Sequence, residues 1–342
     1  MDITFRWYGK DDPVTLEKIR QVPVIDGIVS AIYEVPPGEL WEENKILAMK
    51  NEIESAGLTF EVVESLPVSE DIKLGTDKAP ELLDIYCENV RRLAKYGVKC
   101  ICYNFMPVFD WFRSELYKRN EDNSTCLAYI EEDIAKIDPY NDNLSLPGWD
   151  ESYSQDEVRN LIDAYREIGE EGLWKNLEIF LKKVIPVAEE CGINFAIHPD
   201  DPPWSLFGLD RIITGVDSYK RFFELVDSKA NGITLCTGSL GASKDNDLSE
   251  IIKLSEGRIH FVHLRNVKLG EGRDFEETAH PSKCGSLDMV QILRDLKEVG
   301  FDGYLRPDHG RMIWGETGKP GYGLYDRALG AMYIAGIWET LD

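Results

Sequence analysis

The sequence predicts an α/β protein with the architecture of a (β/α)8 TIM barrel, and two observations support this. Eight short apolar runs alternate with segments of helical spacing along the 342 residues, as parallel strands and their connecting helices do. The first turn reads YGKDDP, and the chain has no GxGxxG or GxxxxGK[ST] motif, which disfavours a nucleotide-binding open sheet. We expect a single domain over residues 1–342, because such barrels often exceed the usual domain length.

The first half of the chain supplies four predicted strands, at residues 3–7, 24–30, 59–65 and 99–104, each a short apolar run. Segments of helical spacing lie at residues 15–20, 40–56 and 79–96, and Gly57 and Gly97 end the last two.

The second half supplies the other four strands, at residues 194–198, 233–236, 259–264 and 304–308. Residues 155–191 form a long predicted helix, and Pro186 inside it predicts a kink or two segments. The remaining helices are predicted at residues 219–227, 247–255, 287–299 and 322–341.

Residues 105–154 interrupt the alternation. This stretch mixes aromatic residues, charges and three prolines without a clear strand, and a short helix is predicted near residues 125–137. We interpret it as an insertion in the loop after the fourth strand, and long loops of this kind are often lids.

Charge and cysteine content limit the partners and the location. The net charge of −24 disfavours nucleic acid and anionic membranes as partners. The N-terminus does not resemble a signal peptide, and no apolar run is long enough to span a bilayer. Seven scattered cysteines without a CxxC motif are typical of reduced thiols, so a cytoplasmic enzyme is expected.

Four candidate metal ligands stand at the ends of four consecutive strands: His198, Cys236, His263 and Asp308. In a barrel, strand ends of this kind converge on one face. Each residue alone has an ordinary explanation as a core or loop residue, but their recurrence favours a shared metal site. Two imidazoles, a thiolate and a carboxylate suit manganese, iron(II), zinc or cobalt better than magnesium.

Polar residues near these strand ends are candidates for substrate handling. His309 follows Asp308 and is a candidate general acid or base. Tyr325, at the start of the last helix, is a candidate proton donor, and Arg306 a candidate clamp for a carboxylate. The other candidate substrate-binding residues are Trp7, Tyr8, Asn104, Arg265 and His280.

Six motifs spread over the chain carry a family resemblance. They are FRWYG (5–9), FAIHPDDPP (195–203), LCTGSLG (235–241), HFVHLRNV (260–267), LRPDHGR (305–311) and GYGLYDRALG (321–330). Through them the sequence resembles the mannonate dehydratase family, a metal-dependent branch of the xylose-isomerase-like barrels.

The resemblance implies dehydration of D-mannonate to 2-keto-3-deoxy-D-gluconate and water, with Mn²⁺ or Fe²⁺, in hexuronate (glucuronate) catabolism. It implies that the metal ligands are His198, Cys236, His263 and Asp308, and that His309 and Tyr325 act as acid and base. It also implies a homodimer.

Three other functions are compatible with a barrel of this type. An aldose–ketose isomerase usually needs several carboxylates around two metals, whereas Glu64 is the only comparable additional acid at a strand end. An endonuclease acting on abasic DNA is disfavoured by the net charge. A non-catalytic barrel that binds a sugar acid or a partner protein requires a vestigial metal site.

Overall fold

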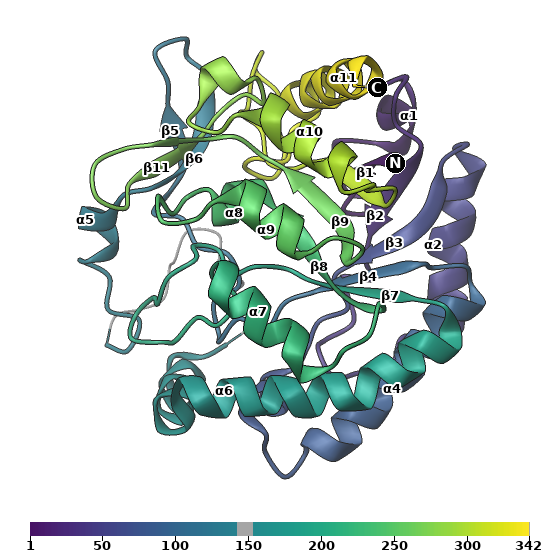
Figure 1. Cartoon of the computed structure of the whole chain (residues 1–342), viewed down its shortest axis with the longest axis vertical. Helices are drawn as coiled ribbons and strands as arrows, with labels where there is room; N and C mark the ends of the chain where they lie inside the picture. The colour runs from purple at the N-terminus through teal and green to yellow at the C-terminus, as the bar shows by residue number, and fades with distance from the viewer. Residues whose placement is uncertain (142–152, 342) are drawn as a thin grey trace.

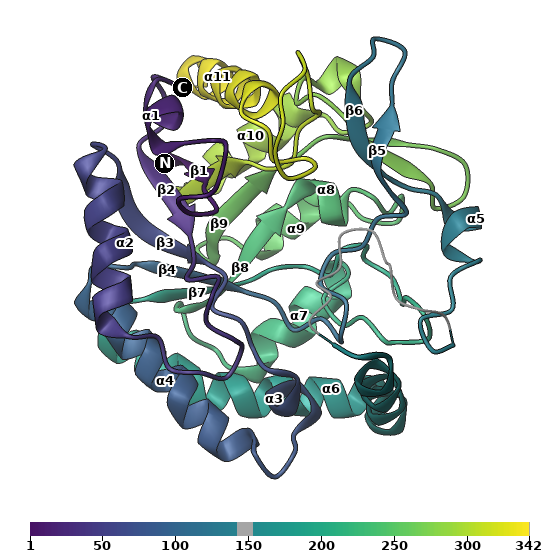
Figure 2. The same cartoon turned by 180° about the vertical axis from the view of Figure 1, so that it is seen from behind.

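The computed structural model describes residues 1–141 and 153–341, and it has the predicted (β/α)8 barrel (Figures 1 and 2). The barrel strands are β1 (Asp2–Arg6), β2 (Gly27–Ser30), β3 (Thr59–Glu64), β4 (Cys100–Tyr103), β7 (Asn194–Ile197), β8 (Asn231–Cys236), β9 (Ile259–Leu264) and β12 (Tyr304–Pro307). They are parallel and close in the order β1-β12-β9-β8-β7-β4-β3-β2. Each predicted strand corresponds to one of these.

Helices surround the strands (Figure 1). The structure adds two short helices, α3 (Glu70–Leu74) and α8 (Thr237–Leu240), to those predicted. No helix among residues 1–141 and 153–341 is long and apolar enough to cross a membrane. The bounds of the surrounding helices are α1 (Leu16–Arg20), α2 (Glu43–Ser55), α3 (Glu70–Leu74), α4 (Ala79–Lys95), α6 (Gln155–Cys191), α7 (Val216–Leu225), α8 (Thr237–Leu240), α9 (Leu248–Leu254), α10 (Met289–Glu298) and α11 (Tyr325–Thr340).

The long helix α6 is bent at a different residue from the one predicted. Pro186 lies within the helix, and the backbone leaves helical geometry at Gly169, with φ 58° and ψ −173°. Positive φ costs glycine little, because it has no Cβ to clash with the backbone. The predicted kink therefore exists, but a glycine makes it.

The barrel interior is packed. Six mostly small side chains from five strands form a buried cluster inside it: Val29, Val62, Cys100, Cys102, Ala196 and Phe261. A much larger apolar cluster fills the space between the strands and the surrounding helices. Because side chains close the interior in this way, a ligand site in such a barrel forms at the strand ends.

The register of three neighbouring strands places three candidate site residues at the same height along the barrel axis. Cys236 on β8 pairs with His263 on β9, and His263 pairs with Arg306 on β12. Asp308 follows directly after β12. These side chains come from distant parts of the sequence, and the parallel pairing places them side by side.

The predicted insertion after β4 is confirmed, and it contains a short helix as predicted, but it also contains two strands that were not predicted. The segment forms β5 (Glu115–Arg119) and β6 (Thr125–Tyr129), followed by the short helix α5 (Glu131–Ile134). β6 pairs with β11 (Phe275–Glu277), and β11 pairs with β10 (Val267–Leu269), giving an antiparallel sheet in the order β10-β11-β6-β5. The partner of β6 lies far away in the chain, so the local sequence does not reveal it. Residues 142–152 of the predicted lid lie outside the described residues.

Candidate active site

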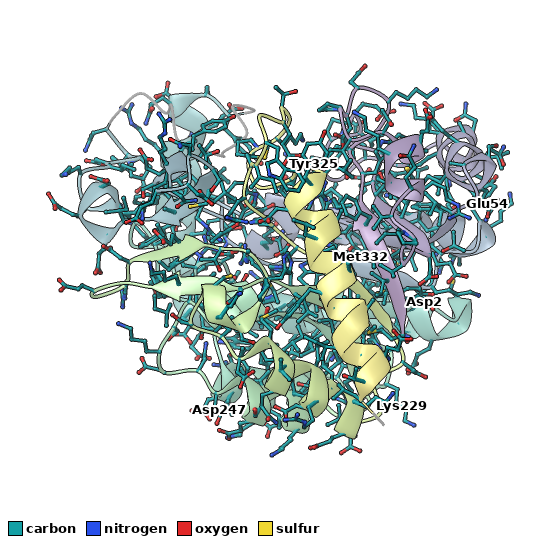
Figure 3. All side chains as sticks on the ribbon, turned by 90° about the horizontal axis from the view of Figure 1, so that it is seen from above. Asp2, Glu54, Lys229, Asp247, Tyr325 and Met332 are labelled. Atoms are coloured by element: carbon teal, nitrogen blue, oxygen red, sulfur yellow. The ribbon has the colours of Figure 1, made fainter. Side chains whose placement is uncertain are left out.

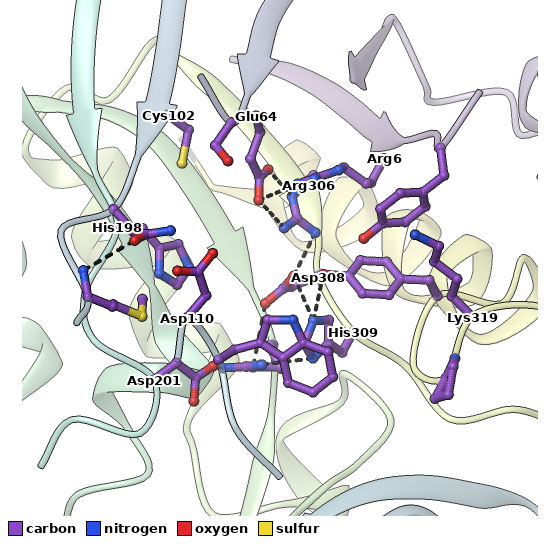
Figure 4. A pocket seen from close by; sticks show the side chains of 18 of the residues that line it. Arg6, Glu64, Cys102, Asp110, His198, Asp201, Arg306, Asp308, His309 and Lys319 are labelled. Carbon is purple, nitrogen blue, oxygen red and sulfur yellow. Dashed lines mark hydrogen bonds and ion pairs between the residues drawn. The ribbon is translucent and has the colours of Figure 1, made fainter. Parts of the chain in front are cut away.

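A cavity of about 590 Å³ opens at the C-terminal ends of the barrel strands (Figure 4). Arg6, Glu64 and Tyr103 are the last residues of β1, β3 and β4, and all three line it. His198 and Asp308, which follow β7 and β12, line it too. The strand ends that the sequence analysis singled out thus meet at one site.

Three of the four predicted metal ligands form a compact group. Ligand atoms of His198, Cys236 and His263 all lie within 4.8 Å of one another, and Nε2 of His198 is 3.2 Å from Nδ1 of His263. Burial lowers the pKa of His198, which favours the neutral imidazole that binds metals. Two nitrogens and one sulfur fit a first-row transition ion and leave coordination positions for a substrate.

The fourth predicted ligand, Asp308, lies beside this group. Its Oδ2 is 3.6 Å from Sγ of Cys236, while its Oδ1 is 2.6 Å from Nη1 of Arg306. Burial would raise the pKa of Asp308, but the neighbouring positive charges, Arg306 first among them, together outweigh burial and hold this pKa well below its usual value. The carboxylate is therefore ionised, as a metal ligand must be.

Arg306, the predicted carboxylate clamp, is paired with protein carboxylates. It donates to both oxygens of Glu64, at 3.0 Å each, in addition to its contact with Asp308. Nη1 of Arg6 lies 2.5 Å from the same Glu64 carboxylate. Burial would raise the pKa of Glu64, but Arg306 and Arg6 lower it well below its usual value. Glu64 is thus an anion held by two arginines.

His309 lies between two oxygen-bearing side chains. Its Nε2 is 2.7 Å from the hydroxyl of Tyr322, and its Nδ1 is 2.9 Å from both carboxylate oxygens of Glu277. Burial raises the pKa of Tyr322, so this hydroxyl keeps its proton at neutral pH. His309 and Tyr322 both line the cavity, and together they can accept and donate protons there.

Tyr325, the predicted proton donor, is not brought to the cavity. It is the first residue of α11, its side chain is 41% exposed, and its ring packs against that of Trp314. Tyr322, three residues earlier, occupies the position expected for Tyr325. It precedes the helix and follows Gly321, which has a positive φ of 78°. The sequence GYGLYDRA contains both tyrosines, and nothing in it distinguishes them.

The remaining predicted substrate-binding residues divide into two groups. Tyr8, Asn104 and Arg265 line the cavity. Trp7 instead packs in the apolar core, and His280 is buried with its Nε2 2.9 Å from the carbonyl oxygen of Leu264. His280 therefore contacts the backbone at the end of β9.

Sequence reasoning missed several polar residues at the site. Lys319, Asp201 and Asp110 line the cavity with Tyr322, and Trp111 is also in its wall. The HPDD motif does contain Asp201. Glu277 and Arg113 lie in the β10-β11-β6-β5 sheet region, for which the sequence analysis predicted no strands, and no signal pointed to either.

Comparison with known proteins identifies the family of this chain. The model of the family described as D-mannonate dehydratase (UxuA) matches residues 1–342. The mannonate dehydratase of Streptococcus uberis is 55% identical over 343 residues, which cover 100% of this chain and 99% of that protein. The mannonate dehydratase of Oceanobacillus iheyensis is 54% identical over 342 residues, covering 100% of this chain and 98% of that protein.

Solved structures give the same result. The crystal structure of mannonate dehydratase from Streptococcus suis serotype 2 is 47% identical, has a TM-score of 0.91, and the match covers 99% of this chain and 94% of that one. An L-ribulose 3-epimerase has a TM-score of 0.56 at 13% identity over 99% of this chain and 95% of its own, which is a likeness of fold alone. The chain therefore belongs to the D-mannonate dehydratase (UxuA) family, whose members are hydro-lyases.

Proposed function

We propose that the protein catalyses the dehydration of D-mannonate to 2-keto-3-deoxy-D-gluconate and water, a step of glucuronate catabolism, in the cavity at the strand ends. One observation carries this proposal. His198, a member of the possible metal group with Cys236 and His263, lines the same cavity as the proposed proton-handling pair of His309 and Tyr322. A dehydration next to a carboxylate needs both functions, because a proton must leave C2 and a hydroxyl must leave C3.

The bound cation is inferred to be Mn²⁺ or Fe²⁺, held by His198, Cys236, His263 and Asp308. Such an ion, when bound, withdraws electron density from the substrate carboxylate and makes the C2 proton more acidic. The arginines paired with Glu64 and Asp308 hold these carboxylates in fixed positions.

The two protons of the reaction are assigned to His309 and Tyr322. Nε2 of His309 accepts the C2 proton, and the Tyr322 hydroxyl supplies a proton to the C3 oxygen, which leaves as water. The electron pair of the C2–H bond forms the C2–C3 double bond, and the resulting enol becomes the ketone in water. Tyr322 regains a proton through its hydrogen bond with His309, so the pair returns to its starting state.

The cationic side chains at the cavity admit an anionic sugar acid to a chain of net charge −24. Lys319 is one of them, with Nζ 3.9 Å from the centre of the Tyr8 ring. An aldose–ketose isomerase is less well supported, because Glu64, its additional carboxylate, is already paired with Arg6 and Arg306.

The test is a product assay with a metal analysis on the same preparation. Purified protein supplied with Mn²⁺ or Fe²⁺ is expected to convert D-mannonate to the keto-acid and to contain about one metal ion per chain. Folded, metal-loaded protein that forms no keto-acid contradicts the proposal. Two metal ions per chain together with sugar isomerisation would favour the isomerase instead.

The location and assembly are proposed to be a cytoplasmic homodimer. The seven cysteines are all free thiols, which supports a reducing compartment. A helix face without charge over residues 325–336, which ends before the exposed Glu339, supports the dimer. Tyr325, Leu329, Met332 and Gly336 are exposed at helical spacing on α11, which lies at the surface (Figure 3). Two copies with a strong negative charge approach most easily through such a neutral face.

A further inference from the structure

Glu277 reaches the active site from outside the barrel. It is the last residue of β11, in the antiparallel sheet formed by the segments that follow β4 and β9. Its side chain is fully buried, and both of its carboxylate oxygens lie 2.9 Å from Nδ1 of His309. Glu277 therefore contacts the ring nitrogen opposite to the one that faces Tyr322.

Two arginines and a second carboxylate fix Glu277 in place. Arg113 donates to Oε1 of Glu277 at 2.9 and 3.1 Å, and Arg265 donates to the same oxygen at 3.0 Å. The same arginines donate to Asp201, at 2.8 Å from Arg113 and 2.7 Å from Arg265. Two positive and two negative side chains thus balance in a buried cluster. Burial would raise the pKa of Glu277, but His309 and the two arginines lower it, so this carboxylate is ionised.

An ionised Glu277 selects one tautomer of His309. Nδ1 lies 2.9 Å from both Glu277 oxygens and also 2.9 Å from Nη1 of Arg265. Nη1 of Arg265 has its own acceptor in Oε1 of Glu277, at 3.0 Å, whereas the carboxylate oxygens can only accept, so a hydrogen on Nδ1 pairs the ring with Glu277. The neutral ring then has its free lone pair on Nε2, where the Tyr322 hydroxyl donates at 2.7 Å. The chain of hydrogen bonds runs from Tyr322 through His309 to Glu277.

We propose that Glu277 is a positioning residue for the dehydration, which holds the His309 ring in the orientation and tautomer that present Nε2 to the substrate and to Tyr322. This inference rests on the proposed roles of His309 and Tyr322. Arg113 and Arg265 support it by fixing the carboxylate. The antiparallel sheet thereby contributes to catalysis, since it carries Glu277 to the barrel mouth.

The variant Glu277→Gln tests this inference. A glutamine can turn its NH2 group toward Nδ1, which stabilises the opposite tautomer and blocks Nε2 with a hydrogen. In enzymes that use a carboxylate–histidine pair, such a change lowers kcat by orders of magnitude while the site geometry is kept, so we expect a fall of about 100-fold or more. The KM for D-mannonate and the metal content per chain are expected to stay close to those of the wild type, because Glu277 is neither a proposed substrate-binding residue nor a proposed metal ligand.

Two further variants complete the experiment. Glu276→Gln is the matched control: Glu276 precedes Glu277 on β11, but its carboxylate pairs with Lys118 and Lys268 away from the cavity. Its kcat should equal that of the wild type. Glu277→Asp keeps the negative charge that pairs with Arg113 and Arg265 and shortens the side chain by one carbon. It is therefore expected to fold even if Glu277→Gln does not. Its kcat is expected to lie between those of the wild type and Glu277→Gln.

The outcomes are distinguishable. Wild-type kcat in folded Glu277→Gln or in Glu277→Asp overturns the inference, and so does a loss of activity that matches a loss of metal. A wild-type enzyme that forms no keto-acid from D-mannonate contradicts the proposed function itself.

Discussion

Nε2 of His198 lies 3.2 Å from Nδ1 of His263, although β7 and β9 are not neighbours in the barrel. The strand between them, β8, ends at Cys236. Two imidazole nitrogens therefore face each other across the end of a strand that carries a thiol. Nitrogens at this distance, with a sulfur within 4.8 Å, form a possible site for a metal ion.

Replacing the thiol tests the metal site. We expect Cys236→Ser to retain less than about a tenth of the wild-type metal per chain, because a serine hydroxyl is a much poorer ligand for transition ions than a thiolate. The measurement is elemental analysis by mass spectrometry after gel filtration, together with the D-mannonate assay. Cys191→Ser, at the end of α6, is the control and should bind metal normally. Unchanged metal content and activity in Cys236→Ser would indicate a vestigial site.

A pair of tyrosine variants tests which ring handles the proton. Tyr322→Phe is expected to lower kcat by about 100-fold or more, because it removes a general acid that lies 2.7 Å from His309. Tyr325→Phe should leave kcat unchanged, because that ring packs against Trp314 outside the cavity. Both variants remove one hydroxyl from the same short segment, so steady-state kinetics on the two gives a direct comparison. The opposite result would return the donor role to Tyr325.

The barrel could be predicted because its pattern is local. Each strand is a continuous apolar run, and its turn residues follow at once, so eight repeats are visible without knowledge of any contact. The grouping of His198, Cys236 and His263 as a possible metal site was predictable for the same reason. Each of its members lies at or next to the C-terminal end of a strand, and the fold itself brings strand ends together.

Features that depend on distant contacts could not be predicted. β6 exists as a strand because it pairs with β11, which lies far away in the sequence. Tyr322 and Tyr325 differ in position because α11 begins at Tyr325 and Tyr322 precedes it, and an element boundary is uncertain by a few residues from sequence alone. Glu277 acquires its contact with His309 only through the antiparallel sheet, so no motif revealed it.

Introducing negative charges on the neutral face of α11 tests whether this face forms the homodimer interface. Leu329 and Met332 are 50% and 45% exposed there, and Leu329→Glu with Met332→Glu is expected to convert the dimer to a monomer, because each copy would bring two negative charges to the contact. Light scattering after gel filtration measures the mass. Leu47→Glu changes a leucine on α2 with 40% exposure and should leave the dimer intact. A wild-type chain that is monomeric, or a charged variant that remains dimeric, would reject this face as the interface.

Removing Arg113 tests how much the buried ion cluster contributes to stability. Its guanidinium is fully buried and pairs with both Asp201 and Glu277, so Arg113→Met leaves two buried carboxylates with fewer positive partners. Breaking a buried pair from one side typically costs about 3–5 kcal/mol, and we expect a loss of that size in the free energy of unfolding, measured by urea denaturation. Arg119→Met removes an exposed arginine from β5 and should change the unfolding free energy by less than about 0.5 kcal/mol. Because Arg113 also fixes Glu277, the same variant should lower kcat. Equal stability of the two variants would mean that the remaining Arg265 is sufficient to compensate both carboxylates.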